Sequence, residues 1–263
     1  MNAYGAIFSA RCRVLLQYRA AAIAGLSTQL FWGFIRVMIF DAFYRSTTSP
    51  QPMSYTEVTT YIWLGQAMLL MIMFGVDTDV RAMIRSGAVA YELLRPLDLY
   101  ALWFSRAVAL RTAPVLLRAV PIFIIAGLFL GLHSPPSWPS AIAWIGATLG
   151  ALFLGSAIAT LLTISLLWTI SGEGISRLVP AVQLIFSGMI IPLPLFPDWA
   201  QPILNLLPFR GLADVPFRLY MGHIPPEQAI GELLHQAAWT LALVALGRWV
   251  LARGLRRLVV QGG

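Results

Sequence analysis

Lysine does not occur anywhere in this chain, and charged residues of every kind make up only 11% of its 263 residues. A soluble domain carries about 25% charged residues on average. Hydrophobic residues account for 59% of the chain, and its mean hydropathy is +0.77. Because so little charge is available to cover a water-facing surface, the composition predicts an integral membrane protein.

The missing lysine and the scarcity of cysteine also exclude several activities. The P-loop that holds ATP phosphates in common ATPases requires a lysine, so this chain is not expected to be a standard ATPase by itself. The single cysteine, Cys12, excludes an internal disulfide and a cysteine metal cluster. His133, His223 and His235 are far apart and lack metal-binding spacing. We therefore expect no enzymatic chemistry, no cofactor and no metal ion in this chain.

Six apolar segments are long enough to be membrane spans, since roughly 20 apolar residues cross about 30 Å of hydrocarbon. They are residues 21–44, 58–80, 100–132, 141–170, 175–196 and 233–253. The stretches 45–57 and 133–140 are polar and rich in turn residues, which is typical of loops. The sequence therefore predicts an all-α, polytopic membrane protein that forms one domain over residues 1–263, with six transmembrane helices in the lipid bilayer.

The formal net charge of +7 comes entirely from 18 arginines. They stand beside apolar segments rather than in one solvated patch, so no nucleic-acid partner is expected. Cytosolic loops are enriched in basic residues. With the N-terminus inside, the inner arginines are Arg11, Arg13, Arg19, Arg81, Arg85, Arg95, Arg177, Arg253, Arg256 and Arg257, and the outer ones are Arg45, Arg210 and Arg218. This distribution predicts that both termini are cytosolic.

Residues 1–20, ahead of the first span, have the periodicity of an amphipathic helix. Its apolar face would carry Tyr4, Ile7, Phe8, Cys12, Leu15 and Leu16, with most arginines opposite. That pattern favours a helix lying in the inner membrane interface. The alternative is a cytosolic extension of the first span. A cleavable signal peptide is not expected, because the apolar run is too long and no convincing cleavage site follows.

Residues 186–232 are apolar but broken by proline. The prolines of its first part are Pro192, Pro194, Pro197, Pro202, Pro208 and Pro216. They would interrupt any single helix repeatedly. We expect two or three short helices that dip into the outer half of the bundle, where neighbouring spans shield the broken backbone.

Small residues recur every four positions in the fourth span, at Ala143, Ala147, Ala151, Gly155 and Ala159, with Gly146 and Gly150 as a second pair. Such spacing lets helix backbones approach closely. Alanine is also common in apolar spans, so close packing and chance are both open interpretations.

Arg36 lies well inside the first span, where a central arginine costs about 2.5–3.5 kcal/mol on insertion scales. It either faces the bundle interior or a water-filled cavity, or it extends towards the outer interface. Asp41, five residues later, is poorly placed to pair with it on the same helix.

Charged residues also gather near the inner ends of the second and third spans. Asp77 and Asp79 stand next to arginines at 81 and 85, which predicts an ion-pair cluster. In the third span, the spacing of Arg106 and Arg111 favours an interfacial position, whereas Arg118, between two prolines, is expected to face the interior.

Two stretches are more specific than the rest. IRSGAVAYELLRPLD at 84–98 is a charged segment between two spans, and SGMIIPLPLFPDW at 187–199, followed by LLPF at 206–209, is the broken outer region. With an N-terminal interfacial helix and six spans, they resemble the permease subunits of ABC transporters of the ABC-2 family. The first stretch is similar to one bacterial branch in its glycine and Leu-Arg-Pro residues. The resemblance covers essentially the whole chain.

The resemblance implies that residues 81–98 form a coupling segment that docks on a separate ATPase subunit. The residues implied in coupling are Arg85, Ser86, Gly87, Glu92, Arg95 and Pro96. Ser86 and Gly87 are expected at the start of its helix, and Pro96 at its end. Glu92 and Arg95 are expected to contact the ATPase. The alternative is an ordinary polar loop.

The resemblance also implies a translocation pathway or outer gate near the residues Arg36, Asp41, Phe186, Gly188, Met189 and Ile190. It implies two ATPase subunits that bind ATP and Mg, a second permease of the same or a sister kind joined through the first and fifth spans, and a bacterial cytoplasmic membrane. The exported substrate would be lipophilic or amphipathic.

A different class of function is an ion-coupled secondary carrier or channel that acts alone. Secondary carriers often contain inverted repeats and an acidic residue at mid-membrane. This chain has no convincing repeat of its halves, and its acids cluster at span ends. These observations favour the permease.

Overall fold

The computed structural model describes residues 3–17, 19–72, 75–169 and 173–256, and within these ranges it contains helices and turns but no β-strand. The α-helices are α1 (Ala3–Leu16), α2 (Arg19–Ser46), α3 (Tyr55–Ile72), α4 (Thr78–Ser86), α5 (Val89–Leu93), α6 (Leu99–Phe129), α7 (Trp138–Ser165), α8 (Glu173–Phe186), α9 (Gln201–Leu206), α10 (Asp214–Met221) and α11 (Ala229–Leu255). Short 3-10 helices are η1 (Leu193–Leu195), η2 (Pro208–Leu212) and η3 (Pro226–Gln228). The all-α prediction is confirmed.

In the described ranges, four helical stretches are long and apolar enough to cross a membrane. They are Ala22–Ser46, Leu99–Phe129, Trp138–Ser165 and Pro226–Leu255. The helices at the predicted second and fifth spans are shorter, because α3 has 18 residues and α8 has 14. At 1.5 Å per residue, α8 is about 21 Å long, less than the hydrocarbon thickness. The count of six spans therefore stays a prediction.

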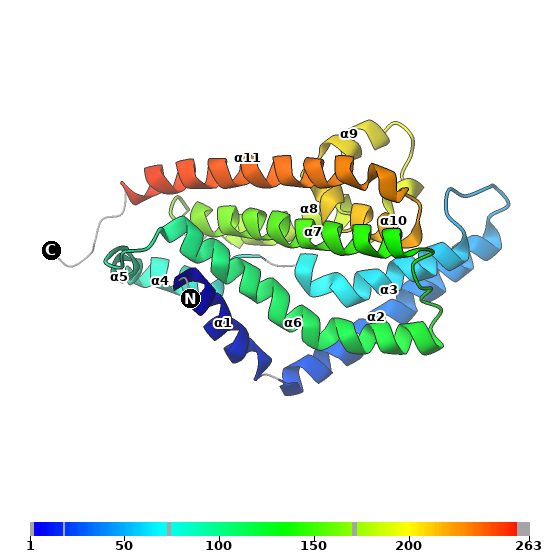
Figure 1. Ribbon diagram of the computed structural model, residues 1–263, viewed down its shortest axis with the longest axis horizontal. Coiled ribbons are helices and arrows are strands. Elements are labelled where there is room, and N and C mark those ends of the chain that lie inside the picture. Colours follow the sequence, from blue (N-terminus) through cyan, green and yellow to red (C-terminus); the bar gives the residue numbers. More distant parts are fainter. Residues whose placement is uncertain (1–2, 18, 73–74, 170–172, 257–263) are drawn as a thin grey trace.

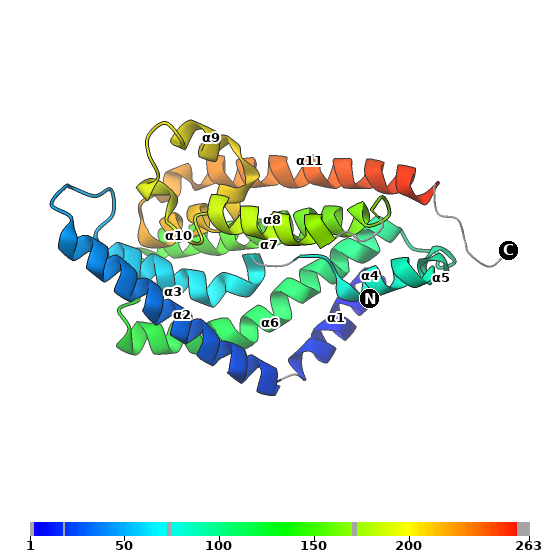
Figure 2. The same cartoon turned by 180° about the vertical axis from the view of Figure 1, so that it is seen from behind.

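Three long helices, α2, α6 and α7, pack around α3. Figure 1 shows α7 and α11 side by side along one edge, with α6 crossing diagonally towards α2, and Figure 2 shows α8 in front of α7 when the molecule is seen from behind. Helix α3 packs against α2, α6, α7 and α10. Because neighbours surround it, α3 is buried over most of its length and carries the centre of the core, including Tyr61 and Trp63.

Local sequence signals determine where several helices begin. Ahead of α3, the Ser54 N–H donates to Glu57 Oε2 at 2.6 Å and the Glu57 N–H donates to Ser54 Oγ at 3.3 Å, which is a capping box. Asp98 caps α6 by accepting from the Ala101 N–H at 2.7 Å. These caps satisfy backbone donors that the first turn of a helix leaves unpaired.

The small residues of α7 form a packing face. Ala147, Ala151, Gly155 and Ala159 are buried, and α7 makes extensive contact with α6, α10 and α11. Close helix packing is therefore the correct interpretation of their spacing.

The second pair of small residues receives a side chain of α11. Gln236 is buried, and its Nε2 donates to the carbonyls of Ala147 at 3.0 Å and Gly211 at 2.7 Å. A Cβ at Gly150 would lie 2.3 Å from the Gln236 Oε1. Glycine at 150 therefore lets this amide join α7, α11 and η2.

The two ends of the bundle differ. Helices α4 and α5, the start of α1 and the end of α11 lie at one end, whereas α9, α10 and the loop between α2 and α3 lie at the other (Figure 1). Within 186–232, the prolines divide the chain into α9, α10 and 3-10 turns, and the position of these elements in the outer half of the membrane stays a prediction. Residues 1–2 of the predicted interfacial helix, residue 170 of the fourth span and Arg257 lie outside the described residues.

Candidate functional site

The stretch at 84–98 forms two short helices instead of one. Helix α4 begins at Thr78, where Asp77 Oδ1 accepts from the N–H groups of Asp79 at 2.9 Å and Val80 at 3.2 Å. It ends at Ser86, because Gly87 adopts a left-handed φ of 74° and donates its N–H to the Ile84 carbonyl at 3.3 Å. The expectation that Ser86 and Gly87 start a helix is therefore corrected: they end α4.

Helix α5 follows as a five-residue turn over Val89–Leu93. Pro96 lies exposed in the connection between α5 and α6, where the sequence predicted the end of the segment. The segment therefore leaves α3, makes two short helices and returns into α6 at the Asp98 cap.

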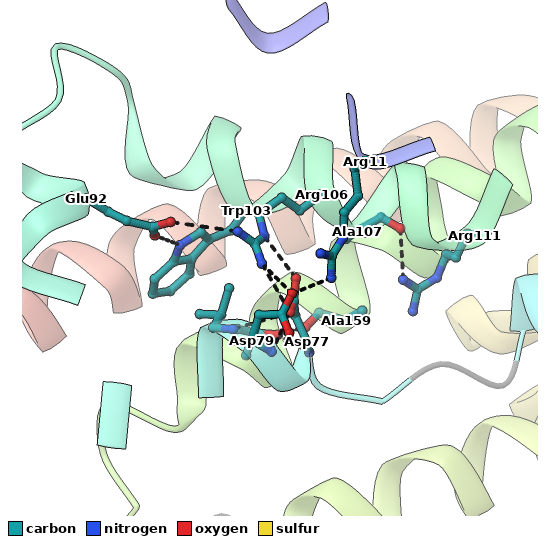
Figure 3. A network of polar contacts seen from close by, with 11 residues as sticks. Arg11, Asp77, Asp79, Glu92, Trp103, Arg106, Ala107, Arg111 and Ala159 are labelled. Carbon is teal, nitrogen blue, oxygen red and sulfur yellow. Dashed lines mark hydrogen bonds and ion pairs between the residues drawn. The ribbon is translucent and has the colours of Figure 1, made fainter. Parts of the chain in front are cut away.

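Arg106 of α6 is the centre of an ion-pair network beneath these helices (Figure 3). Its Nε lies 3.0 Å from Asp77 Oδ2, and its Nη2 lies 3.3 Å from Asp79 Oδ2. Arg11 of α1 also reaches Asp79, at 2.6 Å. The Asp77 N–H donates to Thr163 Oγ1 of α7 at 3.3 Å. One arginine thus links the segment before α6 to α6, and its partners Asp79 and Asp77 extend the link to α1 and α7.

Glu92 of α5 belongs to the same network. Its Oε2 accepts from the Trp103 Nε1–H at 2.8 Å, and its Oε1 lies 3.8 Å from Arg106 Nη1 (Figure 3). Glu92 is only 7% exposed. The sequence analysis expected Glu92 to contact an ATPase; in this structure its carboxylate faces α6, together with Val89 one turn earlier, and makes internal contacts.

Apolar contacts hold the same two helices against the bundle. Val80 of α4, Val89 of α5, Trp103 of α6, Ile164 of α7 and Leu251 of α11 are buried in one cluster, which we call the inner cluster. Burial of aliphatic side chains contributes about 1.5–3 kcal/mol each. The segment is therefore a packed part of the bundle and not a free loop.

The opposite face of the segment is open. Tyr91 is 73% exposed and Leu94 is 81% exposed. Arg85 and Arg95 are exposed on the same segment. We call Arg85, Tyr91, Leu94 and Arg95 the outward face. Large exposed apolar side chains flanked by arginines are characteristic of interaction surfaces.

At the other end, two of the residues expected at an outer gate come together. Arg36 Nη2 of α2 donates to the Ile190 carbonyl at 2.9 Å. Met189 is buried against Gly65 of α3, and a Cβ at Gly65 would lie 3.6 Å from Arg36 Nη1. Arg36 therefore faces α3 and the broken segment after α8, as the interior interpretation predicted, and bridges α2 to that segment.

The turn after α8 has a defined backbone geometry. Gly188 has a φ of 83°, and a Cβ there would lie 2.5 Å from the Tyr61 Oη. The Tyr61 hydroxyl donates to Asp214 Oδ1 at 3.3 Å, and the Asp214 N–H donates to the Ser187 carbonyl at 3.1 Å. Glycine is required at 188 because both the positive φ and the tyrosine exclude a side chain.

The remaining gate candidates lie apart from this contact. Asp41 forms an ion pair with Arg45, one turn later in α2, at 2.9 Å. Phe186 packs against Phe209 of η2, with ring centroids 6.3 Å apart. The structure therefore brings Arg36 and Ile190 together with Met189 and Gly188 nearby, but not Asp41.

Sequence reasoning missed the role of Arg106 and misplaced Arg111. Arg106 was expected at the interface but is mostly buried in the network. Arg111, also expected at the interface, is 1% exposed, and its Nε lies 3.4 Å from where a Cβ of Gly155 would be. The available signal was the glycine within the small-residue spacing of α7, since a missing side chain leaves room for a guanidinium.

Comparison with known protein families identifies a matching family. The family model described as ABC-2 family transporter protein matches residues 30–262, which is most of the chain. The comparison with curated proteins and the comparison with solved structures found no match.

Proposed function

The chain belongs to the ABC-2 transporter family, and from this premise we propose that it is the membrane-spanning permease subunit of an ATP-driven exporter. The observation that carries the proposal is the family match, joined with a packed segment at 78–98 whose outward face is open. The chain has no lysine for a P-loop. ATP and Mg are bound by separate ATPase subunits, two for each pair of permeases.

The outward face is the docking surface for an ATPase subunit. Tyr91 and Leu94 supply apolar anchors, and Arg85 and Arg95 supply positive charge beside them. Aromatic residues and arginine are enriched among the residues that dominate interface energies. The matching groove on the ATPase therefore has an apolar floor and carboxylates at its rim.

The Arg106 network carries movement of the docked segment into the bundle. A displacement of α4 or α5 acts on Asp77, Asp79 and Glu92, and through Arg106 it acts on α6. Because the Asp79 carboxylate reaches Arg11 and the Asp77 N–H reaches Thr163 Oγ1, α1 and α7 receive the displacement too. Glu92 is thus a transmitting residue and not a docking residue.

The bridge from Arg36 to the Ile190 carbonyl closes the outer side of the pathway. An arginine bonded to a backbone carbonyl can be released without breaking a covalent or packed element, so it suits a contact that opens during transport. The exported compound is lipophilic or amphipathic, in keeping with the aromatic-rich spans. The protein has six spans, both termini in the cytosol, and lies in a bacterial cytoplasmic membrane beside a second permease.

Two groups of variants test the docking surface and the network separately. In complexes co-expressed with the cognate ATPase, Leu94→Asp and Arg95→Glu should lower recovery of the ATPase about tenfold or more while the membrane level stays normal. Arg106→Gln should keep ATPase recovery but reduce ATP-driven transport in proteoliposomes. Arg45→Glu, an equivalent charge reversal at the exposed end of α2 far from α4 and α5, is the matched control.

Transport measurements also distinguish the permease from the alternative function, an ion-coupled secondary carrier. A chain that transports substrate by itself in proteoliposomes under an ion gradient, with no ATPase bound, would be a secondary carrier. Normal ATPase recovery in both Leu94→Asp and Arg95→Glu would show that the outward face is not the docking surface.

A further inference from the structure

An apolar groove lies between α7, α8 and α11, away from the residues that the proposed function uses. Its volume is about 630 Å³. Its floor is formed by the aliphatic side chains Ile158, Leu161, Leu162, Ile175, Val179 and Val250. Binding sites for small amphiphilic molecules have volumes of about 300–1,000 Å³. The groove is therefore large enough to hold one hydrocarbon chain.

The groove has a polar and an apolar end. Trp168 and Trp249 line it together with Arg253, which lies in the last turn of α11. Trp at the ends of membrane helices marks the level of the lipid headgroups. Ile158, Leu161 and Leu162 of α7 precede Trp168, and Val179 follows Ile175 in α8, so the floor extends from the level of Trp168 and Arg253 deeper into the hydrocarbon, away from the end where α4 and α5 lie.

Arg253 gives the rim a fixed positive charge. Its guanidinium stacks over the Trp249 ring at 4.0 Å from the centroid. Within the described part of the chain, no carboxylate forms an ion pair with Arg253. By contrast Arg248, on the same helix, pairs with Asp98 at 3.2 Å. An arginine held at headgroup level without an internal carboxylate is complementary to an anionic headgroup.

We propose that this groove binds one anionic phospholipid from the cytoplasmic leaflet, with an acyl chain along the floor and the phosphate on Arg253. A free anion would not use the apolar floor, and a lipid without net charge would not use the arginine. Leu167 and Val250 pack against the inner cluster. The bound lipid therefore lies next to the ends of α7 and α11 against which α4 and α5 pack. The inference does not depend on which ATPase the chain binds.

Native mass spectrometry of the detergent-purified protein tests this proposal. Dioleoylphosphatidylglycerol and dioleoylphosphatidylcholine, which share the same acyl chains, are added at equal concentration. One arginine near an anionic surface contributes about 1 kcal/mol, so the phosphatidylglycerol adduct should be about fivefold more abundant. Arg253→Gln should abolish this preference, whereas Arg253→Lys and the matched control Arg248→Gln should keep it.

Filling the groove tests the other half of the proposal. Leu161→Trp should reduce the one-lipid adduct of both lipids, whereas Leu241→Trp, on the exposed outer part of α11, should not. Thermal unfolding in the same detergent identifies any variant that has lost its fold. Equal binding of the two lipids by the wild type, or an unchanged adduct in a folded Leu161→Trp protein, would overturn the proposal.

Discussion

Glu92 is a single carboxylate that serves two donors on α6. Replacing it with alanine leaves the buried Trp103 Nε1–H without its acceptor and removes a charge near Arg106. A buried donor left unsatisfied costs about 1–3 kcal/mol. Glu92→Ala should lower stability by about that amount. Glu92→Gln should cost less, because its amide oxygen still accepts from the indole.

The measurement is the thermal or denaturant unfolding of the purified protein, with Trp103→Phe as the control background. Removing the indole donor should reduce the cost of Glu92→Ala by about 1 kcal/mol, as expected for directly coupled residues. Equal costs in both backgrounds would mean that the hydrogen bond between Glu92 and Trp103 does not contribute.

At this scale, sequence reasoning located charged residues but not their partners. Asp77 and Asp79 were correctly expected in an ion-pair cluster, yet Arg106 is 27 to 29 positions away from them. No periodicity within one helix reveals a contact between helices. Only the apolar residue Val89, three positions earlier, indicated that the Glu92 side chain faces the bundle. A five-residue helix is too short for that spacing to be decisive.

At the scale of elements, Gly87 decides where α4 ends. A Cβ there would meet no atom within 4 Å, so any effect of substitution comes from the backbone alone. A non-glycine residue in the left-handed region costs about 1–2 kcal/mol, and asparagine tolerates it better than alanine. Gly87→Asn should therefore be milder than Gly87→Ala, and Gly87→Pro, whose φ is fixed near −65°, should be worst.

The comparison needs both unfolding and ATPase recovery, because the two should change in the same order. Ala88→Gly is a useful control, since residue 88 has an ordinary helical φ of −63°. If Gly87→Ala and Gly87→Asn were indistinguishable from wild type in both measurements, the turn between α4 and α5 would not define the docking geometry.

The contact between α7 and α11 gives a second prediction for elements. Gly150→Ala places a methyl group where the Gln236 amide lies, and moving that amide breaks its bonds to Ala147 and Gly211. We expect a loss of about 1–3 kcal/mol. In a Gln236→Ala background, Gly150→Ala should cost much less. A double-mutant cycle on unfolding free energies measures the difference, and additive costs would contradict this account.

Helix boundaries could be predicted from the sequence only where the residues that determine them are close together in the chain. Prolines at 192–216 and the Asp98 cap act within one or two turns, so the short outer helices and the start of α6 were readable. The ends of α3 and α8 were not, because an apolar run continues past the last helical residue in both cases. The expected helix over 175–196 ends at Phe186, where the turn at Gly188 depends on Tyr61 of another helix.

For the molecule as a whole, the burial of the long helices is uneven. Helix α3 is enclosed, but α2 presents a row of large apolar side chains to the outside, among them Phe31, Trp32, Met38 and Ile39. Helix α8 also exposes Leu178 and Ile185. Lipid can cover such surfaces, but α2 also carries Arg36, which contacts the segment after α8. A second permease placed against α2 and α8 would lie next to this polar contact and enclose a pathway between the two subunits.

Cross-linking tests that arrangement in a Cys12→Ser background, which removes the only cysteine. Single cysteines at Ile39 in α2 and Leu178 in α8 should link two permeases through a short bismaleimide. Cysteines at Leu149 in α7 and Leu241 in α11, which are similarly exposed, should remain unlinked. These controls matter because random collisions in a membrane would label all four positions equally. Cross-links formed only through α7 and α11 would place the second permease on the opposite side, and Arg36 would then lie outside any pathway between subunits.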